Sequence, residues 1–145
     1  MYQPPSVEPL EKLLAFARAL GAVPRIVGAA AHDRLLAFLS HLPQLTASAL
    51  MHVVGEAVGE DGLSLAGRGL VDTARLASSP AEMWRDIALA NRKILARVLG
   101  VFIEDLQEFQ FALENQDVKT IEEFFVKAKQ RRDAWRAQAA SPSSE

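Results

Sequence analysis

The sequence contains no cysteine among its 145 residues. Disulfide bonds and thiolate metal sites are therefore excluded, and a reducing compartment is favoured. Acidic and basic residues nearly balance at 18 and 16, so the net charge of −2 gives no electrostatic footprint for nucleic acid. Residues 1–9 lack a basic stretch followed by an apolar run, so we predict no signal peptide and expect a cytoplasmic protein.

Charge is also missing from one long stretch. Residues 35–55 contain no Asp, Glu, Lys or Arg, although 23% of the chain is charged. Polar residues and Pro43 argue against a membrane span, so we predict a helix packed on all sides by protein. Helical phase divides it into an apolar stripe and an uncharged polar side. The stripe is Leu35, Leu39, Leu42, Thr46, Ala49, Leu50, Val53 and Ala57, and the polar side is Ser40, His41, Gln44, Ser48 and His52.

This helix is predicted to begin near Ala30 or His32 and to end near Gly55 or Val58. Pro43 should kink or interrupt it near Leu39, because proline offers no N–H and its ring displaces that carbonyl.

The N-terminal part of the chain predicts one helix and one short strand. Apolar residues at helical spacing begin near Glu8, and Gly21 is a natural stop after Leu20. Residues 23–27 (VPRIV) are the only stretch typical of a strand. A single strand cannot form a sheet, so it would need a partner outside this chain.

The C-terminal half predicts a short helix over residues 70–77 and then a long one. Ser79 as N-cap, with proline next and Glu82 three positions on, is a strong helix start. The apolar pattern continues to Leu113, with Gly100 as its weak point. If continuous, the helix would be roughly 50 Å long, more than a compact chain of this size can cover, so we expect a homodimer. Asp117 should cap a last helix.

The histidines are candidate functional residues. His41 lies on the polar side of the charge-free helix, where it is either a hydrogen-bonded core side chain or part of a site. His32 and Asp33 stand at the helix entry, as a cap or as a site. On a straight helix His32 and His41 point about 180° apart, so they cannot share a metal, and we predict no metal site.

Arg75 is the more informative candidate because its neighbours are mostly apolar. A guanidinium in such surroundings needs an acid or water. Asp72, three positions back, is one possible partner. The alternative is a two-point contact with the carboxylate of an acidic small molecule. Trp84 would either wall the same pocket or belong to the core.

Several motifs occur together in a specific order. They are His32-Asp33, Ser40-His41-Leu42-Pro43, Asp72-Thr73-Ala74-Arg75-Leu76-Ala77, and Pro80 with Met83-Trp84-Arg85-Asp86-Ile87 and Asn91. In order and spacing, residues 8–115 resemble the C-terminal half of the prephenate and arogenate dehydrogenases. The resemblance implies an all-α dimerisation domain with long helices, whose partner is an N-terminal Rossmann domain that binds NAD or NADP.

The resemblance also implies an activity and site residues. The reaction would be the oxidative decarboxylation of prephenate (or arogenate) in tyrosine biosynthesis, with tyrosine as a possible effector. Arg75 would grip the substrate carboxylate, with His41, Gln44, Trp84 and His32 in the same cleft. The family often has histidine where this sequence has Gln44, and glycine where it has Arg68. No catalytic residue is assigned here, and we expect this chain alone to be inactive.

The expected organisation follows from these inferences. Residues 1–29 would be a linker helix and strand from the end of a nucleotide-binding domain. Residues 30–138 would form the helical dimerisation and substrate-binding domain, and residues 139–145 a disordered tail. An alternative function is a stand-alone helical dimer that binds an aromatic amino acid or its precursor as a regulatory module.

Overall fold

The computed structural model of the chain describes residues 7–140, and every regular element in that range is helical. The predicted all-α class is therefore confirmed. The described part of the chain divides into two compact units, with the division between Leu36 and Ala37. This division falls later than the domain boundary expected after residue 29.

The N-terminal unit contains helices α1 (Val7–Ala19) and α2 (Ala29–Leu36). Gly21 ends the first helical stretch as predicted: its φ is +79°, and the next N–H, of Ala22, donates to the carbonyl of Ala17 at 3.1 Å. Residues 22–28 carry no regular structure, so the strand predicted at 23–27 is wrong. The part of the chain that the structure describes offers no second strand to pair with this segment.

The C-terminal unit begins with a π-helical turn, η1 (Ala37–His41), followed by α3 (Leu42–Leu63). Pro43 stands at the start of α3. Proline cannot donate to the preceding turn, and the widened π turn accommodates its ring, so the predicted interruption near Leu39 is confirmed. Gly59 has a φ of +62° and breaks the helical geometry near the predicted end of this helix.

The charge-free helix faces its own chain with its polar side. His41 and Gln44 are 7% and 4% exposed, and they are buried with Ala37 and Ala47. On the apolar stripe, Leu39 is 72% exposed. The other members of the stripe are exposed or half-buried, so the expectation of a helix covered on all sides is wrong for this chain by itself.

Four helical elements lie between α3 and the last helix. They are α4 (Arg68–Ala74), the 3₁₀ turn η2 (Arg75–Ser78), α5 (Ala81–Ala90) and α6 (Arg92–Glu114). The short helix predicted over residues 70–77 is confirmed.

The single long helix predicted from Pro80 to Leu113 is wrong. Asn91 separates α5 from α6 with φ −106° and ψ 20°, outside the helical region, whereas Gly100 lies inside α6. At this break the side-chain amide of Asn91 lies 3.4 Å from Nδ1 of His41, a tertiary contact across 50 positions. The predicted cap is also wrong, because α5 begins at Ala81 without a side-chain cap.

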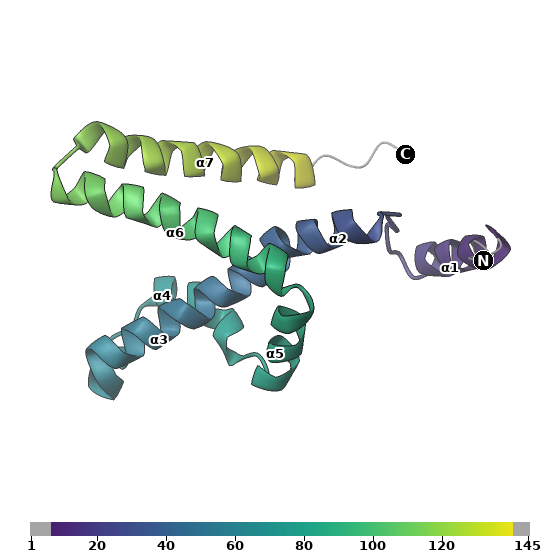
Figure 1. The fold of residues 1–145 in the computed structure, drawn as a ribbon, viewed down its shortest axis with the longest axis horizontal. Helices are drawn as coiled ribbons and strands as arrows, with labels where there is room; N and C mark the ends of the chain where they lie inside the picture. Colours follow the sequence, from purple (N-terminus) through teal and green to yellow (C-terminus); the bar gives the residue numbers. More distant parts are fainter. Residues whose placement is uncertain (1–6, 141–145) are drawn as a thin grey trace. The chain divides into compact units, whose positions relative to one another are not determined.

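Helices α6 and α7 (Val118–Ala140) form an antiparallel pair (Figure 1). Three phenylalanines hold them together: Phe109 lies 4.5 Å from Phe124 and 5.6 Å from Phe125, measured between ring centroids. Residues 141–145 of the expected tail lie outside the described range.

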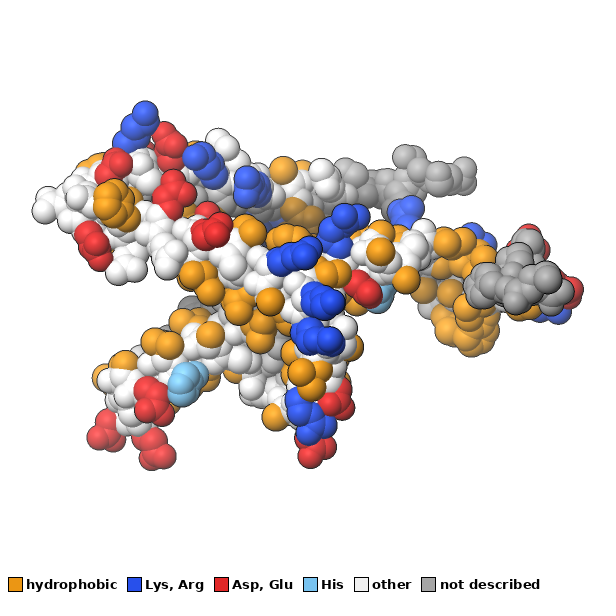
Figure 2. All heavy atoms as spheres, in the orientation of Figure 1, with side chains coloured by type: hydrophobic (Ala, Val, Ile, Leu, Met, Phe, Trp, Pro, Cys, Tyr) orange, Lys and Arg blue, Asp and Glu red, His pale blue; other side chains and the backbone are white. Residues whose placement is uncertain are grey.

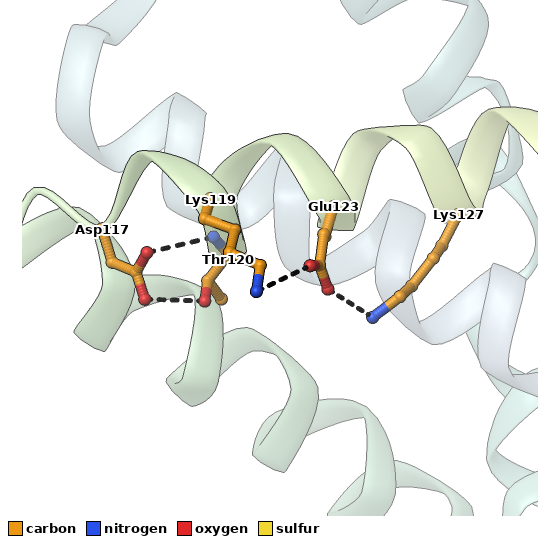
Figure 3. Close-up of polar contacts among 5 residues, drawn as sticks. All are labelled: Asp117, Lys119, Thr120, Glu123 and Lys127. Carbon is orange, nitrogen blue, oxygen red and sulfur yellow. Dashed lines mark hydrogen bonds and ion pairs between the residues drawn. The ribbon is translucent and has the colours of Figure 1, made fainter.

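Asp117 caps α7 as predicted (Figure 3). Its carboxylate accepts hydrogen bonds from the backbone N–H of Thr120 at 3.2 Å and from the hydroxyl of the same residue at 2.7 Å. Further along the exposed side of α7, Glu123 pairs with Lys119 at 4.0 Å and Lys127 at 3.1 Å.

Few apolar side chains are buried by this chain. In the described residues the buried hydrophobic side chains are Ala37, Ala47, Leu95, Val98 and Ala112. Large hydrophobic side chains reach the surface along α3 and α6 (Figure 2), among them Val53, Val101 and Phe111. Within residues 7–140, no helix is both long and apolar enough to cross a membrane.

The turn between α6 and α7 predicts a stabilising substitution. Gln116 has a φ of +54°, and the N–H of Asp117 donates to the carbonyl of Ala112 at 2.9 Å, which closes a Schellman motif. Because a left-handed conformation is unfavourable for residues other than glycine, Gln116→Gly should raise the free energy of unfolding by up to about 1 kcal/mol. Gln107→Gly, inside α6, should lower it by about 1 kcal/mol. Equal destabilisation by both would contradict this interpretation.

The Asp117 cap predicts a pH effect. Hydrogen bonds from the Thr120 side chain and backbone lower the pKa of Asp117 below its ordinary value of 3.8. The ionised Asp117 cap therefore contributes its full share of the free energy of unfolding above pH 3.8. That stabilisation is lost as the pH falls through the lower pKa of the folded state. A carboxyl NMR titration should show this low pKa, and Thr120→Val should move it back toward 3.8. An unchanged pKa in that variant would show that the hydroxyl is not the cause.

Candidate functional site

His41 ends the π turn η1 and lies against α5 and the start of α6. Its Nδ1 lies 3.4 Å from Nδ2 of Asn91, and its ring meets the edge of Trp84 at a centroid distance of 6.0 Å and an angle of 82°. The structure therefore brings together two of the predicted site residues, His41 and Trp84, and adds Asn91 as the contact that joins them to α6.

Trp84 is half-buried on α5. Its indole Nε1 is buried and has no hydrogen-bond partner among the described residues. Buried N–H groups without an acceptor cost about 1–3 kcal/mol, so such a group marks a place where an acceptor from another molecule would be favourable.

Gln44 lies one turn beyond His41 and points its amide at η2. Its Nε2 donates to the carbonyl of Leu76 at 2.8 Å and lies 3.5 Å from the hydroxyl of Ser48. Its Oε1 accepts from the hydroxyl of Ser79 at 3.3 Å. The side chain of Gln44 thus joins α3 to the turn that begins at Arg75.

Arg75 is exposed at the first position of η2. Within residues 7–140, no ion pair joins it to Asp72 or to any other carboxylate. The alternative in which Asp72 neutralises Arg75 is therefore wrong. A guanidinium on a fixed turn without an acidic partner is suited to a carboxylate ligand.

His32 lies on α2, in the N-terminal unit. Its Nδ1 is 3.2 Å from Oδ1 of Asp33, and both side chains are more than half exposed. Across the described part of the chain, no three His, Asp or Glu side chains form a group able to hold a metal ion.

Two hollows occur elsewhere in the C-terminal unit. One, of about 310 Å³, is mostly apolar and lies between α3 and the α4–η2 segment. The other, of about 390 Å³, lies between α6 and α7 and carries both acidic and basic side chains. Neither lining includes His41, Trp84 or Arg75.

Sequence reasoning did not assign a site role to Ser79 or Asn91. Ser79 was expected to cap α5, but its hydroxyl also lies 2.8 Å from the Leu76 carbonyl. Only tertiary contacts reveal these roles, that of Asn91 with His41 and that of Ser79 with Gln44, because the local sequence around each residue does not show them.

Comparison with known proteins identifies the fold. The family model described as "Prephenate dehydrogenase, dimerization domain" matches residues 28–127. The chain belongs to this family. The chain is 33% identical to the prephenate dehydrogenase of Bacillus subtilis over 105 residues, which are 70% of this chain and 28% of that protein. It is 30% identical to the prephenate dehydrogenase of Lactococcus lactis over 129 residues, 88% of this chain and 36% of that protein.

A solved structure has the same dimerization-domain fold. The prephenate dehydrogenase of A. aeolicus, in complex with hydroxyphenyl propionate and NAD⁺, superimposes with a TM-score of 0.82 at 22% identity. The superposition covers 92% of this chain and 48% of that one. The chain thus spans less than half of the length of these relatives.

The buried position of His41 in this dimerization domain predicts a stability effect. His41→Ala would remove its contacts with Asn91 and Trp84 and should lower the free energy of unfolding by about 1–3 kcal/mol. His52→Ala is the matched control, because that side chain is exposed on α3 and its loss should change stability by about 0.5 kcal/mol or less. Chemical denaturation at one fixed protein concentration measures both, and equal effects would contradict the assignment.

Proposed function

We propose that this chain is the dimer-forming and substrate-binding half of an NAD(P)-dependent prephenate dehydrogenase. The enzyme would oxidatively decarboxylate prephenate to 4-hydroxyphenylpyruvate in tyrosine biosynthesis. Family membership supports the class of enzyme. The observation that carries the substrate role is Arg75, an exposed guanidinium without an acidic partner on a turn fixed to α3.

The site would be built around that guanidinium. Gln44 stands three residues after His41, about one helical turn along the chain, so its hydrogen bond to Leu76 attaches the Arg75 turn next to the residue that contacts Trp84. A substrate carboxylate would bind Arg75 through two parallel hydrogen bonds. The buried indole N–H of Trp84 would gain an acceptor from a bound ligand or from a neighbouring domain.

The homodimer is part of this proposal. On the apolar stripe, Leu39 of η1 and Val53 of α3 are 72% and 63% exposed, and Val101 on α6 is 57% exposed. Burial of such side chains would contribute about 1.5–3 kcal/mol each. A second copy that presents the same stripe is the partner that a symmetric interface requires.

The cofactor is assigned to another part of the enzyme. A dinucleotide site needs a strand, a glycine-rich turn and a helix, and residues 7–140 contain no strand. The described residues therefore do not fit NAD or NADP. The nucleotide would be held by a nucleotide-binding domain outside this sequence.

The carboxylate role of Arg75 predicts a kinetic effect. In the dehydrogenase assembled from this chain and its nucleotide-binding half, Arg75→Ala should raise KM for prephenate roughly 10- to 100-fold, with a smaller change in kcat. Arg75→Lys should be intermediate, because lysine keeps the charge but not the planar fork.

Arg85→Ala is the control, because that guanidinium is exposed and already paired with Asp86 at 2.8 Å. Unchanged kinetics in Arg75→Ala would reject the substrate site. Saturable tyrosine binding by this chain alone, without turnover in the assembled enzyme, would instead favour the regulatory module.

A further inference from the structure

The carbonyl of Leu76 is the point where the Arg75 turn is attached to α3. It lies within hydrogen-bonding distance of three donors: Nε2 of Gln44 at 2.8 Å, the hydroxyl of Ser79 at 2.8 Å, and the backbone N–H of Ser79 at 3.1 Å. Two of these donors belong to Ser79, the residue that follows the turn. Gln44 is the donor that comes from another helix.

Gln44 is also among the most buried polar side chains in the described residues, with 4% exposed. An amide has two N–H donors and one carbonyl acceptor, and each end of this one faces protein groups: Leu76 and Ser48 at Nε2, and Ser79 at Oε1. The side chain is thus occupied on both ends by its own chain.

The η2 turn needs a hydrogen bond from outside, such as the one from Gln44, to hold its backbone in place. η2 is four residues long and 3₁₀ in character, a geometry with weak internal hydrogen bonds. Arg75 opens the turn, and its long side chain amplifies any rotation of the backbone. Two-point binding of a carboxylate tolerates little misalignment, and displacement of a binding group by about 1 Å can be costly.

We propose that Gln44 is a positioning residue for Arg75. Its amide fixes the backbone of η2 against α3 and thereby sets the direction of the guanidinium, and it does not contact the substrate. This inference rests on the proposed function, since it concerns the same substrate site.

A double-mutant cycle in the assembled dehydrogenase tests this proposal. Gln44→Met keeps the shape of the side chain but removes its hydrogen bonds. Gln44→Met alone should lower kcat/KM for prephenate about tenfold, mainly through KM. In the Arg75→Ala background the same change should have almost no further effect, because the group that it positions is already absent.

Two other variants complete the test. Ser79→Ala removes the hydroxyl that faces Oε1 of Gln44, so it should produce a smaller KM effect that also vanishes in the Arg75→Ala background. Ser79→Ala supplies the same test if the Gln44→Met variant does not fold. Gln110→Met is the control, because Gln110 is exposed on α6 and its amide donates to Glu114 at 2.9 Å on the same helix, so this variant should leave the kinetics unchanged.

The outcomes separate the inference from the proposed function. If Arg75→Ala leaves KM unchanged, the substrate site itself is wrong. If Arg75→Ala raises KM but Gln44→Met does not, Gln44 has no positioning role. If the two effects multiply independently, Gln44 acts by direct contact with the substrate or through general stability, and the positioning role is rejected. Loss of the Gln44→Met effect in the Arg75→Ala background supports it.

Discussion

The structure depends on how one charge-free helix is buried. Its polar side, with His41 and Gln44, packs inside the C-terminal unit, and its apolar stripe stays largely uncovered. Burying amide and imidazole groups is tolerated only when they find partners, and here they are provided by Leu76, Ser79 and Asn91. The same hydrogen bonds that make this burial possible also attach the segments bearing Arg75 and Trp84. The contacts that form this core are therefore the same ones that hold the candidate site residues, while the apolar stripe stays uncovered by this chain.

Much of the fold follows from local chemistry. The stop at Gly21, the interruption before Pro43 and the cap at Asp117 each depend on the conformational limits or hydrogen-bonding capacity of one residue, and the sequence displays these directly. Two expectations failed because tertiary contacts decide them. Residues 23–27 have strand propensity, but no neighbouring strand among the described residues to pair with. Asn91 breaks a continuous helical pattern because its side chain turns toward His41, which stands 50 positions earlier.

The sequence suggested candidate site residues, whose roles stay a prediction, but it did not give their arrangement. Motif spacing indicated His41, Trp84 and Arg75, and the structure joins the first two directly. Sequence alone could not decide whether Asp72 neutralises Arg75, because helical spacing permits the pair without requiring it. It also could not show that Gln44 faces the Leu76 carbonyl, a contact across 32 positions. Long-range contacts of this kind decide which polar groups are occupied and which stay available to a ligand.

We propose that the uncovered apolar stripe is an interface between two copies of this chain. Its most direct test is the solution mass by light scattering across a hundredfold dilution, with circular dichroism at each concentration. If the stripe is an interface, the mass should be twice that of the 15.8 kDa chain down to low micromolar concentration. Helicity should be lost when the dimer finally dissociates. A monomer that keeps its full helicity throughout the dilution would contradict the proposed interface, because it would show that the chain is stable without a second copy on the stripe.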